Sequence, residues 1–359
     1  MKSYNHLWEK LISKENIILA INNSSKGKRD RKSVKRIYEN AEYYVSYFQK
    51  YAMNFENEKH EPKKIYDGMS RKERYIVVPK YREQVIHHMI VNVLIPIFTN
   101  GMYEHTYASL PNRGAHKGKY FIKKWIASDP KNVKYCYKMD IQKFFDSIPH
   151  DKLKSMLAKK IHDDRFLDLL FNVIDVTESG LPLGFYTSQW LANWYLQGLD
   201  HFIKEDLKAK YYIRYMDDMV IFGSNKRELH RIHDRIEEYM KNELGLNIKH
   251  NWQVFRFDYK RSGKRRGRFL DFMGFRFYRD KIILRKKIMI KITRKAKKIS
   301  AKEKPSIYEI RQMLSYMGWI KSCDVYDMYI TRVKPFVDVR KMKKRVSTYD
   351  KRQKTMKGA

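Results

Sequence analysis

Apolar residues follow two different periods along this chain. Between residues 1 and 60, and again from Glu83 to Phe98, they recur at every third or fourth position, which predicts helices. The stretches 135–140 and 211–222 are short runs of aromatic, aliphatic and β-branched residues, which is typical of strands. A further amphipathic helix is expected over 227–246. The chain is therefore expected to contain both helices and strands.

The strand-forming segment from Tyr211 to Phe222 contains two adjacent acids, Asp217 and Asp218. Apolar residues on both sides predict a strand, a two-residue turn and a second strand, with the acids at the tip. Adjacent carboxylates repel each other, so a cation is expected beside them, and hard oxygen ligands favour Mg²⁺. The alternative interpretation is a surface turn between two ordinary strands.

A third acid, Asp140, ends the predicted strand 135–140, and a helical turn is expected to begin near Phe144. An isolated aspartate at a strand end usually caps a helix or forms a turn. If this strand lies beside the hairpin of Asp217 and Asp218, however, three carboxylates could bridge two Mg²⁺ ions about 4 Å apart.

Three polar stretches are candidates for ligand contacts. A short strand ended by Pro79 is bracketed by cations that include Arg74 and Arg82. The turn-rich loop 107–116 contains Arg113, which could contact a phosphate backbone. The loop 180–189 precedes an apolar helix expected from Trp190 to Leu199. In that loop Gly184 permits close backbone approach, and Ser188 and Gln189 can donate hydrogen bonds.

The charge balance indicates a polyanionic partner. The chain has 76 Lys and Arg against 40 Asp and Glu, a net charge of +36, which exceeds what solubility requires. Residues 281–359 contribute 24 basic and 6 acidic residues, which is half of the excess. Basic helices are expected from Ile288 onward, so this region is predicted to contact nucleic acid. The alternative is a solvated basic face.

Cysteine usage and hydropathy favour a cytoplasmic protein. Cys136 and Cys323 form no metal-binding pattern, which is typical of a reducing compartment and predicts no zinc site. Charges interrupt the first 20 residues, and no uncharged apolar run reaches about 18 residues. Neither a signal peptide nor a membrane span is therefore expected.

These segments resemble reverse transcriptases over nearly the whole chain, in the order that the family shows. Asp140, the Gly184–Ser188 loop, the Tyr-Met-Asp-Asp box at 215–218 and the Gly274-Phe275 hairpin resemble the palm motifs called A, B, C and E. The resemblance implies a right-hand polymerase of the α+β class. An N-terminal extension and fingers would occupy 1–130, a palm with an antiparallel sheet 131–285, and a basic helical thumb 286–359.

The resemblance also implies residue roles. Asp140, Asp217 and Asp218 would be the catalytic carboxylates that hold two Mg²⁺ ions, with Mn²⁺ as a substitute. Phe145 matches the family's aromatic gate, which excludes a 2′-hydroxyl and so favours dNTPs. The residues expected to bind the nucleotide are Arg74, Arg82, Phe145, Leu183, Gly184, Ser188, Gln189, Tyr215 and Met216. Those expected to bind nucleic acid are Arg113, Lys286, Lys287, Arg294 and Lys298.

One departure from the usual pattern indicates a subfamily. Most reverse transcriptases begin motif B with Gln-Gly and end it with Ser-Pro, whereas this chain has Leu183-Gly184 and Ser188-Gln189. That version is similar to the reverse transcriptases of diversity-generating retroelements, whose cDNA synthesis is error-prone at template adenines. The resemblance then implies an RNA template, an RNA–cDNA duplex, a basic accessory oligomer and a structured non-coding RNA as partners, in a bacterium or phage.

Three alternatives stay open at this point. Defence-associated bacterial reverse transcriptases share the palm motifs and vary in architecture. A catalytically silent RNA-binding scaffold could keep the polymerase shape, although it would not need Asp140, Asp217 and Asp218 in a basic groove. An RNA polymerase is the third, and Phe145 argues against it because such enzymes usually place an aspartate there.

Overall fold

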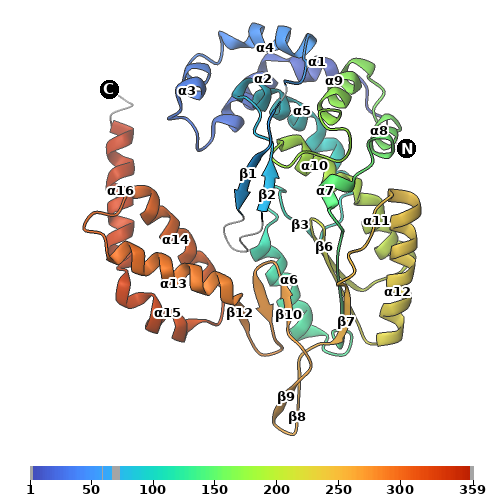
Figure 1. Cartoon of the computed structure of the whole chain (residues 1–359), viewed down its shortest axis with the longest axis vertical. Coiled ribbons are helices and arrows are strands. Elements are labelled where there is room, and N and C mark those ends of the chain that lie inside the picture. The colour runs from blue at the N-terminus through green and yellow to red at the C-terminus, as the bar shows by residue number, and fades with distance from the viewer. Residues whose placement is uncertain (1–2, 59, 67–72, 356–359) are drawn as a thin grey trace. The chain divides into compact units, whose positions relative to one another are not determined.

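A computed structural model describes residues 3–58, 60–66 and 73–355 (Figure 1). The chain forms two compact units. The first comprises the described residues of 1–66, 73–114 and 137–254, and the second those of 115–136 and 255–359. The predicted division into fingers, palm and thumb remains a prediction.

The first unit surrounds a five-stranded sheet with helices. The strands of the first unit, within and outside this sheet, are β1 (Lys63–Tyr66), β2 (Glu73–Ile76), β3 (Thr106–Tyr107), β4 (Tyr135–Asp140), β5 (Tyr211–Tyr215), β6 (Asp218–Gly223) and β7 (Gln253–Arg256). Strands β4 and β7 extend into the second unit. Its helices are α1 (Leu7–Ile12), α2 (Lys14–Ser25), α3 (Lys32–Glu39), α4 (Tyr44–Met53), α5 (Tyr81–Thr99), α7 (Phe144–Ser147), α8 (His150–Ala158), α9 (Asp164–Ile174), α10 (Tyr186–Tyr195), α11 (Gln197–His201) and α12 (Lys226–Tyr239). Single π-helical turns follow α11 and α12, at Phe202–Asp206 and Met240–Leu244.

The central sheet has the strand order β3-β5-β6-β4-β7. Strands β5 and β6 form the predicted antiparallel hairpin, in which Tyr215 pairs with Asp218 across a two-residue turn. The edge strand β3 runs parallel to β5, so the sheet is mixed rather than wholly antiparallel as expected. Its interior side chains, such as Tyr212, Ile213 and Val220, are fully buried, as the apolar runs predicted.

Helix α5 connects the N-terminal helices to the sheet-covering helices, because it packs against both α2 and α10. It begins directly after Pro79, where the buried Glu83 carboxylate accepts a hydrogen bond from the Lys80 backbone N–H at 2.7 Å. His87 of α5 is hydrogen-bonded to Thr187 of α10 through Nδ1 at 3.0 Å. Burial lowers the pKa of His87 to about 3, so this contact involves a neutral ring.

The second unit combines α6 (Ala115–Ser128), a three-stranded antiparallel sheet and four C-terminal helices. The sheet is β10 (Leu270–Phe272), β11 (Phe275–Phe277) and β12 (Ile282–Leu284), in that order. The helices are α13 (Lys286–Ser300), α14 (Ile307–Lys321), α15 (Tyr326–Arg332) and α16 (Val339–Thr355), with a short 3₁₀ helix at Lys334–Phe336. Phe275 stacks on Trp319 of α14, with ring centroids 5.1 Å apart.

Two predicted elements differ from the structure. Helix α10 begins at Tyr186, four residues before the expected Trp190, so Ser188 and Gln189 are helical rather than part of a loop. The clustered charges and glycines of 260–268 predict a basic loop, but this stretch contributes to an antiparallel hairpin of β8 (Tyr259–Arg261) and β9 (Lys264–Arg266). Its exposed side chains gave no hydrophobic alternation from which a strand could be predicted.

None of the helices in the described part of the chain combines the length and apolar character that crossing a bilayer requires.

Candidate active site

The sheet brings the predicted acids to one place. Asp140 is the last residue of β4, Asp217 lies in the turn between β5 and β6, and Asp218 begins β6. Because β6 lies between β5 and β4, the hairpin tip and the end of β4 are neighbours. The predicted juxtaposition of Asp140 with the hairpin is therefore present.

Asp140 and Asp217 are close enough for their carboxyl groups to share a hydrogen bond. Burial, and then the charge of Asp140, raise the pKa of Asp217 to about 7. Two carboxyl groups in this arrangement hold a proton near neutral pH, because both cannot be ionised cheaply side by side. A divalent cation would remove that conflict and replace the proton.

Lysines accompany two of the three acids. Lys249 Nζ lies 3.1 Å from Asp140 Oδ2, and Lys138 Nζ lies 3.4 Å from Asp218 Oδ1. Across residues 3–58, 60–66 and 73–355, no three His, Cys, Asp or Glu side chains come together as a metal-binding group. Asp140 and Asp217 thus form a pair, while Asp218 is directed to Lys138.

A buried arginine holds the hairpin turn. Arg214 of β5 is fully buried and forms an ion pair with Asp200 at 2.5 Å. Its Nη1 also donates to the Met216 carbonyl at 3.2 Å, inside the turn itself. Met216 has a φ of 57°, a conformation that costs a non-glycine residue free energy. The arginine therefore stabilises the backbone that positions Asp217.

The two phenylalanines that follow Asp140 differ in burial. Phe144 is buried, with 3% of its surface exposed, whereas Phe145 is only partly buried. The Phe145 carbonyl accepts a hydrogen bond from the Leu181 N–H at 2.7 Å, which joins the predicted gate to the 180–189 loop. A Cβ on Gly180 would come within 2.6 Å of the Asp146 backbone, so this contact requires glycine.

The next part of that loop packs against the chain that follows β2. The Leu183 carbonyl accepts a hydrogen bond from the Val77 N–H at 2.7 Å. Gly184 has a φ of +115°, and a Cβ there would lie 2.1 Å from the Val77 carbonyl oxygen. The predicted close backbone approach at Gly184 is therefore to the protein's own chain. In α10, Ser188 is buried and Gln189 is exposed.

The two predicted finger cations lie in different environments. Arg74 is an exposed residue of β2, where it pairs with Ile65 of β1. Arg82 lies in the first turn of α5, forms an ion pair with Glu58 and lies over the Tyr51 ring at 5.5 Å from its centroid. Their predicted role toward a triphosphate remains a prediction.

The predicted nucleic-acid contacts also differ among themselves. Arg113 donates to the Tyr103 carbonyl at 2.7 Å, which fixes its guanidinium on the protein backbone. The predicted cations of α13 are exposed, and Lys287, Arg294 and Lys298 recur at helical spacing on one side. The buried Ile288, Ile292, Ala296 and Ile299 form the other side. Together with Lys286, α13 presents a basic face away from its packed one.

Sequence reasoning missed Arg214, Lys138 and Lys249. An arginine inside the apolar run Tyr211–Tyr215 was the available signal for the first, because a charge in a buried strand needs a partner. Lys138 is two residues before Asp140 on the same strand and therefore on the same face. Lys249 carried no local signal, because its proximity to Asp140 arises from the bridge between Ile141 and Ile248.

Comparison with known proteins identifies the family. Residues 58–275 match the family model described as reverse transcriptase (RNA-dependent DNA polymerase). The retron Ec73 reverse transcriptase of Escherichia coli is 26% identical over 211 residues, covering 55% of this chain and 64% of that protein. An uncharacterised 91 kDa protein in a cob intron of Schizosaccharomyces pombe is 31% identical over 157 residues, covering 41% of this chain and 19% of that protein.

This chain thus spans less than two thirds of the length of these curated relatives. Among solved structures, apo telomerase from Candida tropicalis superposes with a TM-score of 0.48 at 13% identity, covering 75% of this chain and 55% of that one. The family match extends over more than half of the chain, and the protein therefore belongs to the reverse transcriptase family.

Proposed function

We propose that this chain is an RNA-directed DNA polymerase whose catalytic centre is built on Asp140 and Asp217. The observation that supports this most strongly is the pair of carboxyl groups at the ends of the central strands, where the pKa of Asp217 is raised to about 7. The strands and the tight turn between them, and not flexible loops, position both carboxyl groups, so the pair is suited to binding a cation. The α+β fold and the family membership agree with the predicted right-hand polymerase class.

The donor set fits Mg²⁺ because both groups are hard oxygen ligands. Asp140 and Asp217 would hold the metal, and Asp218 would join them if it exchanged Lys138 for a cation. When bound, two such ions would activate the primer 3′-oxygen and stabilise the leaving pyrophosphate. Mn²⁺ has the same preference for oxygen ligands and could substitute.

The surrounding residues would position the reactants. Arg214 keeps the turn in the conformation that presents Asp217. Phe145 is partly exposed and fixed through its carbonyl to Leu181, so it could lie under a deoxyribose and exclude a 2′-hydroxyl. We expect Phe145→Ala to increase NTP incorporation relative to dNTP incorporation. An unchanged ratio would contradict the gate assignment.

The subfamily assignment rests on the atypical Leu183-Gly184 and Ser188-Gln189 pattern. We infer error-prone cDNA synthesis of the kind found in diversity-generating retroelements. Leu183 is partly buried and lies beside Val77, and it places no polar side-chain group there. Leu183→Gln is expected to lower misincorporation at template adenines. If the error rate at adenine stays the same in a purified assay, the inference fails.

The proposed partners are a template RNA, its duplex with cDNA, dNTPs and, for the retroelement role, a structured RNA with a basic accessory oligomer. The net charge of +36 would repel a basic oligomer at long range. Such a partner would therefore dock through an acidic patch or through the RNA.

The deciding experiment measures Mg²⁺-dependent dNTP incorporation on a primed RNA template. Asp217→Asn should abolish incorporation, whereas Asp206→Asn, at an exposed carboxylate, should not. RNA binding by gel shift serves as the control for folding. Binding without incorporation under every primer condition would favour the RNA-binding scaffold and refute the polymerase.

A further inference from the structure

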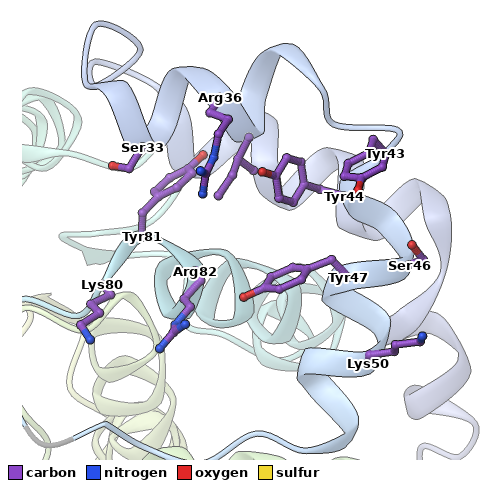
Figure 2. A pocket seen from close by; sticks show the side chains of 11 residues that line it. Ser33, Arg36, Tyr43, Tyr44, Ser46, Tyr47, Lys50, Lys80, Tyr81 and Arg82 are labelled. Carbon is purple, nitrogen blue, oxygen red and sulfur yellow. The ribbon is translucent and has the colours of Figure 1, made fainter.

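A cavity of about 980 Å³ lies within the first unit, between α3, α4 and the beginning of α5 (Figure 2). It is lined by aromatic and basic side chains, and none of its lining residues is acidic. The carboxyl pair Asp140–Asp217 does not line it.

One wall is a row of tyrosines on α4. Tyr43, Tyr47 and Lys50 recur at helical spacing on the cavity side, whereas Phe48 and Ala52 are buried on the other side. Tyr43 is 80% exposed and Tyr47 is 40% exposed, so these rings are not core residues. Tyr44 lies between them, with centroids 5.6 Å from Tyr43 and 5.8 Å from Tyr47. The cavity therefore offers adjacent aromatic faces to solvent.

Cations line the cavity from α3, α4 and the beginning of α5. Figure 2 shows Arg36 and Tyr81 across from Tyr44 and Tyr47, with the Tyr47 hydroxyl pointing towards Arg82. Lys80 and Arg82 share Glu58 as an ion-pair partner. Arg36 and Lys50, both exposed, have no carboxylate within ion-pair distance among the residues that the structure describes. At least two positive charges thus face the cavity without compensation.

We propose that this cavity binds a single-stranded RNA segment, with bases stacked on the α4 tyrosines and phosphates held by Arg36 and Lys50. Stacking platforms beside cations are the two components of single-strand recognition. A duplex would not fit this chemistry, because its bases are already stacked on one another. The choice of RNA over other polyanions rests on the proposed function.

The size of the cavity favours a strand over a free nucleotide. At about 980 Å³ it is at the upper end of the range for small-ligand pockets, and Arg36, Tyr43, Tyr47 and Lys50 in its lining are exposed. Several rings and cations along one helix also suit successive nucleotides better than one. A mononucleotide would leave most of these groups without a contact.

The test measures binding of a fluorescent twelve-nucleotide RNA, without dNTPs or divalent ions, so that its outcome is independent of polymerisation. Tyr43→Ala and Arg36→Gln should each weaken binding by at least about fivefold, the lower end of what one stacked base contributes. Two matched controls on the same helices, Met53→Ala and Lys35→Gln, lie outside the cavity and should leave binding unchanged.

Cross-linking separates this site from unspecific attraction to a chain of net charge +36. RNA carrying 5-iodouridine should cross-link to Tyr43, Tyr44 or Tyr47, mapped by mass spectrometry. Cross-links elsewhere, together with unaltered affinity of Tyr43→Ala, would overturn the proposal. Competition by UMP at the same nucleotide concentration would overturn the assignment to a strand in favour of a free-nucleotide site.

Discussion

Replacing Asp217 by asparagine should stabilise the metal-free protein while it removes activity. In the folded chain, burial and Asp140 raise the pKa of Asp217 from 3.8 to about 7. Between these values the folded state retains a proton that the unfolded state has lost, so stability falls as pH rises. Below pH 4 both states are protonated and no penalty exists. Above pH 7 the penalty is complete, and asparagine, which carries no charge, avoids it.

The magnitude follows from the size of the shift. About three pKa units correspond to roughly 4 kcal/mol at about 1.4 kcal/mol per unit. This is an upper bound, because Asp217 is only partly buried and the pair can relax towards solvent and Lys249. We therefore expect Asp217→Asn to raise the free energy of unfolding by about 1–3 kcal/mol at pH 8 and by almost nothing at pH 4.

The assay is urea unfolding of wild type and variant from pH 4 to pH 8 in EDTA, followed by the same series in Mg²⁺. Asp218→Asn is the matched control, since Asp218 pairs with Lys138 and its loss should not stabilise the chain. Mg²⁺ should stabilise the wild type selectively, because a ligand that binds only the folded state shifts the equilibrium towards it. The advantage of Asp217→Asn should then shrink.

Three results would refute this reasoning. If Asp217→Asn gave the same difference at pH 4 and pH 8, the carboxyl pair would not be titrating. If it destabilised the protein at every pH, Asp217 would contribute a hydrogen bond that outweighs its charge. If Asp218→Asn stabilised the metal-free protein instead, the destabilising charge would belong to Asp218 and not to Asp217.

The remaining predictions concern the turn, the loop and the basic helix. Arg214→Met leaves Asp200 buried without its partner and should lower the free energy of unfolding in urea by about 3–5 kcal/mol. The rate of dNTP incorporation should fall by more than this loss of folded protein alone would produce. Gly184→Ala should lower stability by at least about 1–2 kcal/mol because of its positive φ, whereas Gly114→Ala, which has open space, should not. Arg294→Gln should reduce the slope of log affinity for an RNA–DNA duplex against log salt by about one. An unchanged slope would exclude a phosphate contact there.

The parts of the site that were predicted from sequence are those specified by local pattern. Asp217 and Asp218 at the tip of a hairpin follow from apolar runs on either side of a polar pair. Asp140 at a strand end follows in the same way. The proximity of these two segments is not a local property of the sequence. It was expected only because the segments resemble an ordered set of family motifs.

Contacts between distant segments escaped prediction for the same reason. The helix containing Ser188 begins at Tyr186, and Thr187 in its first turn is hydrogen-bonded to His87, a hundred residues away in the chain. Arg82 could be named as a cation but not paired, since its partner Glu58 is 24 positions away and belongs to another segment. Periodicity reports which face of an element is buried, but not the partner that covers it.

The buried arginine of β5 explains how a polar turn is held in an apolar hairpin. Burying the Arg214–Asp200 pair with no exposed surface is costly, and an apolar pair of the same size would often be at least as stable. Such a replacement, however, would leave the Met216 carbonyl without its donor at a residue already strained by positive φ. Nη1 also bonds Asn193 of α10 at 3.2 Å, so one guanidinium ties the turn to the helix that contains Ser188 and Gln189. The arginine therefore couples the geometry of the carboxyl pair to the position of α10, which an apolar core could not do.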